Sequence, residues 1–180
     1  MTKEYTMITL GIDLSLTGTG CVVMKGGKMT DNKLIKSKPS GGRPIDELNR
    51  IIKIRDEIEI SDAKIAVIEG LAFMARNTTS LIQLSALNYF VREKLSILSI
   101  PFVIVAPTSL KKFVTGKGNS PKDLMLLATY KKYGEYFTND NLCDAYGLAK
   151  IGHVLTQKNP KLIKPQQEVI NLLKKQYEKK

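Results

Sequence analysis

The sequence predicts a single α/β domain built on a mixed five-stranded sheet with helices on its faces. Three apolar, β-branched segments come first, and short turns containing Gly18–Gly20 and Gly26–Gly27 separate them. Turns this short join antiparallel strands. Two more apolar segments alternate with helical patterns, which is the order of parallel βα units. A length of 180 residues also fits one domain.

Each element has its own local signal. Alternating or continuous apolar runs predict strands at residues 6–13, 21–24, about 33–38, 64–69 and 101–105. Apolar residues at helical spacing, with proline or an N-cap residue at the start, predict helices from Pro44 to about Ile60, over 79–98, from Ser120–Pro121, from Asp140 towards Leu155, and from Pro165. Strands one and four are expected to lie side by side and parallel.

Composition limits the possible chemistry. Lys+Arg 28 against Asp+Glu 17 gives a net charge of +11, which suggests a polyanionic partner, nucleic acid first, over an unspecific basic surface. Residues 157–180 hold seven lysines and two glutamates. They are expected to form a basic helical extension of the domain made by residues 1–156, either as a DNA-facing arm or as a solvated tail. With two distant cysteines and one histidine, a zinc site or a disulfide scaffold is not expected.

No apolar run reaches the roughly 18 residues of a membrane span, and the first residues lack the apolar core of a secretory signal. We therefore expect no membrane association and no export.

Several carboxylates occur inside or at the ends of segments that are otherwise apolar. Asp13 ends the first strand, and Glu69 ends the fourth. Asp140 and Asp144 are four residues apart, so they share one helix face. Each has a structural alternative: a strand-end turn residue, a helix cap, or an acid favoured by the helix dipole. Together, however, they suit a pair of hard cations, Mg²⁺, Mn²⁺ or Ca²⁺, of the kind that hydrolyses phosphodiesters.

Five motifs, in order between residues 8 and 155, carry a family resemblance. They are Gly11-Ile12-Asp13 with Thr17-Gly18, Val67-Ile68-Glu69, Phe73-Met74-Ala75-Arg76-Asn77, the segment 106–118 with its Lys-Lys-x-x-x-Gly-x-Gly block, and Asp144-Ala145 with Leu148-Ala149. In these motifs the chain resembles the RuvC family of Holliday-junction endonucleases. That resemblance implies an RNase H-like fold for the predicted sheet and makes residues 1–156 a nuclease domain.

The resemblance also implies a function. It implies a homodimeric, Mg²⁺-dependent nuclease, with Mn²⁺ as a substitute, that nicks opposed strands of four-way and other branched DNA. It places the protein in the bacterial or phage-infected host cytoplasm. Metal ligands would be Asp13, Glu69 and Asp144.

The DNA-binding residues that the resemblance implies are mostly cations. Lys122 would also help to stabilise the scissile phosphate. Phe73 would stack at the junction centre; a core position is the alternative for Phe73, and a solvated helix face is the alternative for the lysines. The full set is Phe73, Arg76, Lys111, Lys112, Lys117 and Lys122.

The chain departs from the family pattern at Asn141, where the family has Asp or His, and at Leu14, where it has Pro. The fourth metal ligand is therefore open between Asp140 and Asn141. The segment from Glu69 to Phe73 is also one residue longer. These departures indicate a divergent, phage-type member.

The sequence leaves two alternative functions open. One is a branched-DNA-binding protein with a weak or inactive nuclease site, which the change at Asn141 motivates. The other is an actin-like sugar kinase or ATPase, because residues 11–18 resemble the phosphate loop of those enzymes. Such enzymes close a second similar domain over ATP, and one short domain does not supply it.

Overall fold

The computed structural model describes residues 7–39, 41–60, 62–71 and 78–177. The strands are β1 (Ile8–Asp13), β2 (Gly18–Lys25), β3 (Lys28–Lys36), β4 (Ile65–Glu69) and β5 (Phe102–Val105). The helices are α1 (Pro44–Glu57), α2 (Thr78–Ile97), α3 (Pro107–Thr115), α4 (Lys122–Tyr133), α5 (Asp140–Leu155) and α6 (Lys164–Tyr177). No described helix combines the length and apolar character needed to cross a membrane.

The strands form one mixed sheet in the order β3-β2-β1-β4-β5. The first three strands pair antiparallel, β1 pairs parallel with β4, and β4 pairs parallel with β5. The predicted mixed five-stranded sheet is therefore confirmed, including the parallel pairing of its first and fourth strands.

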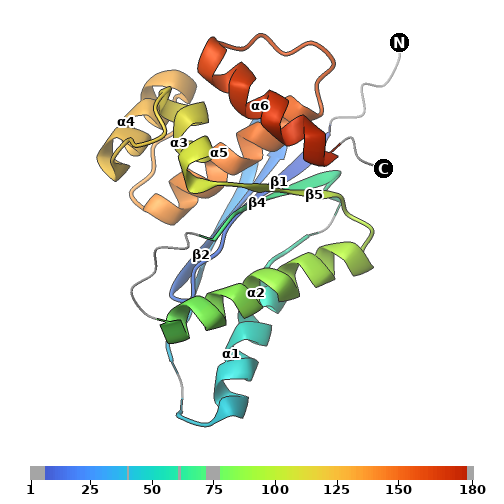
Figure 1. The fold of residues 1–180 in the computed structure, drawn as a ribbon, viewed down its shortest axis with the longest axis vertical. Helices are drawn as coiled ribbons and strands as arrows, with labels where there is room; N and C mark the ends of the chain where they lie inside the picture. The colour runs from blue at the N-terminus through green and yellow to red at the C-terminus, as the bar shows by residue number, and fades with distance from the viewer. Residues whose placement is uncertain (1–6, 40, 61, 72–77, 178–180) are drawn as a thin grey trace.

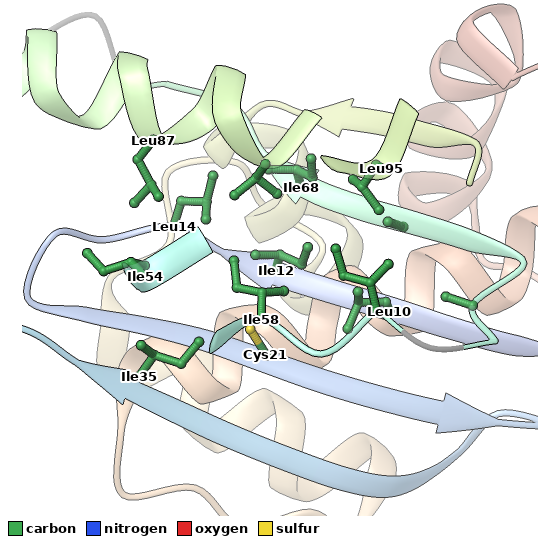
Figure 2. Close-up of a cluster of buried hydrophobic side chains, with 14 of the residues drawn as sticks. Leu10, Ile12, Leu14, Cys21, Ile35, Ile54, Ile58, Ile68, Leu87 and Leu95 are labelled. Atoms are coloured by element: carbon green, nitrogen blue, oxygen red, sulfur yellow. The ribbon is translucent and has the colours of Figure 1, made fainter. Parts of the chain in front are cut away.

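Helices cover both faces of the sheet, as Figure 1 shows: α1 and α2 lie on one side, and α3 to α6 lie on the other. Side-chain alternation along β1 divides the core between these faces. Leu10 and Ile12 are buried towards α1 and α2, together with Ile68 of β4 and with Leu87 and Leu95 of α2 (Figure 2). The second face is completed by α6, whose Val169, Ile170 and Leu173 are buried against β4 and β5.

Three local expectations were wrong. Gly18–Gly20 lies inside β2, and the turn before it is formed by residues 14–17. α3 was not predicted, because it spans 9 residues and its N-cap residue, Ala106, makes no side-chain capping bond. Ser120 does not cap α4: Pro121 stands at the N-cap, and the Ser120 hydroxyl lies 2.7 Å from the Thr115 hydroxyl.

Candidate active site

Asp13 points to the α5 side of the sheet. It ends β1 on the same side as Thr9 and Gly11, opposite Leu10 and Ile12. Thr9 confirms the direction, because its hydroxyl donates to the carbonyl of Ala149 in α5 at 3.1 Å. Asp13 is only 5% exposed. A carboxylate so deeply buried needs a partner or a cation.

Glu69 ends the neighbouring strand on the same face. Ile65 and Val67, at alternate positions of β4, belong to the core beneath α5 and α6, and Glu69 continues that row. In the parallel register Ile12 lies opposite Ile68, so the next residue of each strand is one of the two acids. The carboxyl groups of Asp13 and Glu69 are hydrogen-bonded to each other. Such a bond requires one of them to hold a proton.

Asp144 reaches these acids because α5 lies unusually close to the sheet. A Cβ atom at Gly11 would overlap the carbonyl of Ala145, and one at Gly20 would overlap the carbonyl of Asn141. With no side chain at these two strand positions, the backbone of α5 rests directly on β1 and β2. Asp144, in the second turn of α5, is thereby brought within electrostatic range of Asp13 and Glu69.

Burial makes all three acids costly to ionise. Burial raises the pKa of Glu69 to about 9, and the charges of Asp13 and Asp144 contribute to the rise. Burial also raises the pKa of Asp144 to about 7, with the charge of Asp13 adding to it. The pKa of Asp13 rises to about 6, again chiefly through burial, although its hydrogen bond with Glu69 opposes the rise. Converging carboxyl groups of this kind are typical of functional sites.

Two lysines act on this cluster from separate helices. Lys111 of α3 lowers the pKa of both Glu69 and Asp144 by its charge. Lys122, at the start of α4, lowers the pKa of both Asp13 and Asp144. The ammonium group of Lys122 also pairs with Asp140 Oδ2 at 2.9 Å, and 72% of its side chain remains exposed. The structure therefore brings two of the predicted DNA-binding lysines to the acids.

Neither candidate for the fourth ligand is free. Asp140 is held by Lys122. The side-chain amide of Asn141 donates to the carbonyl of Gly18 and so ties the start of α5 to β2. The N-cap of α5 is Asn139, whose side chain accepts from the Leu142 N–H at 3.1 Å. Asp140 is thus the first helical residue rather than the cap.

The other predicted DNA-binding residues lie elsewhere. Lys112 forms an ion pair with Glu168 of α6, and Lys117 is exposed between α3 and α4. Phe73 and Arg76 lie outside the described residues.

One buried polar residue, Asn88, lies behind Glu69 and was not predicted as part of the site. Asn88 of α2 is completely buried, and its Nδ2 donates to the backbone carbonyl of Glu69 at 3.5 Å. Its Oδ1 is buried without a hydrogen-bond partner among the described residues. A polar residue in the apolar stripe of a helix was the available signal.

The donor chemistry fits a hard divalent cation. Asp13, Glu69 and Asp144 offer oxygen ligands alone, and a cation would relieve the repulsion between them. Nevertheless, no group of three or more His, Cys, Asp or Glu side chains within the described ranges could hold an ion as it stands.

Comparison with known proteins gives a likeness of fold. Neither a model of a protein family nor a curated protein matches the sequence. Among solved structures, Thermus thermophilus RuvC in complex with a Holliday junction substrate superposes with a TM-score of 0.65 at 18% identity, over 82% of this chain and 97% of that chain. Fowlpox virus resolvase, in complex with its substrate Holliday junction DNA, gives a TM-score of 0.55 at 14% identity, over 84% of this chain and 100% of that chain.

The mitochondrial Holliday junction resolvase of yeast is similar as well, with a TM-score of 0.52 at 11% identity, over 94% of this chain and 84% of that chain. At identities this low, the superpositions establish the architecture alone. That architecture agrees with the resemblance found in the motifs. The chain has the RNase H-like fold of RuvC.

Proposed function

We propose that the protein is a metal-dependent endonuclease that nicks branched DNA, four-way junctions above all. The convergence of Asp13, Glu69 and Asp144 at one edge of the sheet carries the proposal. These acids come from three elements far apart in the chain, and their mutual repulsion is unfavourable for the fold alone. Solved structures of the same fold include resolvases bound to four-way DNA.

Asp13, Glu69 and Asp144 would hold the metal. When bound, Mg²⁺ activates water and stabilises the leaving oxygen in phosphodiester hydrolysis, and Mn²⁺ would substitute. The two lysines have a different part. Lys111 and Lys122 bring positive charge beside a site that would otherwise repel a phosphate backbone. Lys122 is well placed to contact the scissile phosphate, because it is exposed and acts electrostatically on two of the three acids.

A homodimer would allow two opposed strands to be nicked. Helix α2 supports this proposal, since its outer side presents Ile82, Tyr89 and Ile97 at 62%, 66% and 74% exposure. Apolar residues spaced along one side of a helix and this exposed are typical of an interface. The guanidinium of Arg92 lies 4.9 Å from the ring of Tyr89.

The test is incubation of the protein with labelled four-way, three-way and linear duplex DNA, with Mg²⁺, with Mn²⁺ and with EDTA. We expect paired nicks in the four-way DNA that require the metal. Asp144→Asn should abolish nicking while binding of the junction persists. Asp123→Asn is the matched control, because Asp123 is exposed in the first turn of α4. Nicking by Asp144→Asn at the wild-type rate would refute the assignment of the site.

A second candidate is a branched-DNA-binding protein with a weak nuclease site. The occupied side chains of Asp140 and Asn141 favour it, because they leave three carboxylates for the metal. Tight binding of four-way DNA without any product in Mg²⁺ or Mn²⁺ would select this candidate.

A further inference from the structure

A hollow of about 580 Å³ lies beside the carboxylates, on the other face of the sheet. Its walls are the turn between β1 and β2, the first turns of α2, and Pro39 and Arg50. Leu14, which directly follows Asp13, is one of its lining residues. The hollow and Asp13 therefore lie at the same end of β1, on opposite faces of the sheet.

The walls are held firmly. Arg50 donates from Nε to the Ser37 hydroxyl at 2.8 Å and from Nη2 to the carbonyl of Leu16. Within the turn, the Thr19 hydroxyl donates to the carbonyl of Ser15 at 2.8 Å and accepts from the Ser15 N–H at 3.1 Å. A cavity with fixed walls loses little conformational entropy when it is filled.

The lining is apolar with a polar edge. Leu14, Leu16, Leu81 and Leu84 supply most of it, and the amide of Gln83 lies among them. Gln83 makes no hydrogen bond to any residue in the described part of the chain. An aliphatic cavity with one free amide matches a flat heterocycle that has apolar faces and hydrogen-bonding groups along its rim. Glutamine amides pair with such rims through one donor and one acceptor.

We propose that this hollow receives one unpaired nucleobase of the strand being cut, with Gln83 against its hydrogen-bonding edge. The proposal rests on the proposed function and adds a determinant of where the strand is nicked. The position of the hollow at the end of β1 selects the occupant: Leu14 of its lining directly follows Asp13, and a strand that reached round this end of the sheet would supply a base next to each phosphate. Its volume falls within the range of about 300–1,000 Å³ that small-molecule sites span, so a single base enters without steric hindrance.

Two variants and two matched controls test the proposal. Gln83→Leu keeps the volume and removes the amide, while Leu81→Phe brings an aromatic ring into the lining, on which a bound base would stack. Their controls, Gln167→Leu and Leu172→Phe, lie on exposed positions of α6. Thermal unfolding verifies that each variant is folded. The substrates are four-way junctions with each of the four bases at the nicked position, and junctions carrying 2-aminopurine there.

Wild-type protein in EDTA should raise the 2-aminopurine fluorescence severalfold, because none of the described residues that line the hollow has an aromatic ring to quench it. Leu81→Phe should abolish that rise. Gln83→Leu should reduce the preference for one base at the nick by about tenfold. The controls should behave as wild type.

Three outcomes would overturn the proposal. Unchanged fluorescence and base preference in both variants would show that no base enters. A shift of Leu81→Phe from dimer to monomer in sedimentation, with base preference retained, would mark the hollow as a contact between copies. Failure of the wild type to bind or cut any branched DNA would overturn the proposed function as well. Normal cutting, with fluorescence and base preference unchanged in both variants, would overturn the base site alone.

Discussion

Replacing Glu69 by glutamine separates the requirements of the site from those of the fold. Glu69 has a pKa of about 9 in the folded chain, against 4.5 for an ordinary glutamate. The unfolded chain therefore releases this proton at lower pH than the folded chain. Between these two values the folded state binds more protons, so the free energy of unfolding decreases as pH rises. In metal-free buffer the wild type should be more stable at pH 5.5 than at pH 8.

The magnitude follows from the same two values. At pH 7.5 the buffer lies three pH units above 4.5, and at about 1.4 kcal/mol per unit the ionisation penalty reaches at most about 4 kcal/mol. Glutamine removes the penalty, but its buried amide costs about 1–3 kcal/mol where it finds no partner. The variant should thus gain about 2 kcal/mol. For a chain of this length that raises the melting temperature by about 4–8 °C.

The assay is thermal unfolding in EDTA at pH 5.5, 7.5 and 8.5, repeated with Mg²⁺. Glu69→Gln should melt higher than wild type in EDTA at pH 7.5 and show a flatter dependence on pH. Added Mg²⁺ should stabilise the wild type more than the variant, because binding to the folded state alone raises stability. Glu59→Gln is the control: Glu59 is 72% exposed in a pair with Lys33, and such pairs contribute little. A melting temperature for Glu69→Gln at or below that of wild type in EDTA at pH 7.5 would refute the reasoning.

The remaining predictions concern α5 and the lysines. Gly11→Ala should lower the free energy of unfolding by about 1–3 kcal/mol or more, because its Cβ overlaps the α5 backbone, whereas Gly42→Ala, with nothing within 4 Å, should not. Chemical denaturation measures both. Lys122→Ala should reduce the slope of log affinity against log salt by about 1 in junction-binding titrations. Asn141→Ala should destabilise the fold by about 1 kcal/mol through its lost bond to β2. In a cleavage time course, Asp140→Asn should lower the rate of nicking more than Asn141→Ala does. If Asn141→Ala lowers it more, Asn141 is favoured as the fourth metal ligand.

The sheet was predictable because its signals are local. Alternation along β1 and a continuous apolar run in β4 gave these strands, and the order of elements gave their parallel pairing. Helix α3 escaped prediction because packing stabilises it: Leu110, Phe113 and Val114 are buried, while its first turn has no capping side chain. The cap of α4 was misjudged for a related reason, since the Ser120 hydroxyl is engaged by Thr115 instead.

The candidate acids could be picked out from the sequence, but the distances between them could not. A carboxylate at the end of an apolar strand is visible in the sequence, and so is an acid inside an apolar helix. Whether Asp144 meets the other two depends on how closely α5 approaches β1 and β2. That approach is set by Gly11 and Gly20, which cannot be told from ordinary strand or turn glycines in the sequence. The partners of Asp140 and Asn141 likewise appear only once α5 is packed against β2 and α4.

The two glycines therefore belong to the site as much as the acids do. When the ligands of a metal site come from two strands and a helix, they must lie on a common face. The strands and the helix must also be close enough for their side chains to meet. At Gly11 any side chain would push α5 outwards and move Asp144 away from Asp13, although neither acid had changed. Since α5 also contacts β4, that displacement would disturb the strand that carries Glu69. The acidic cluster is thus a product of strand register and close helix packing together, and either one alone would leave the carboxylates apart.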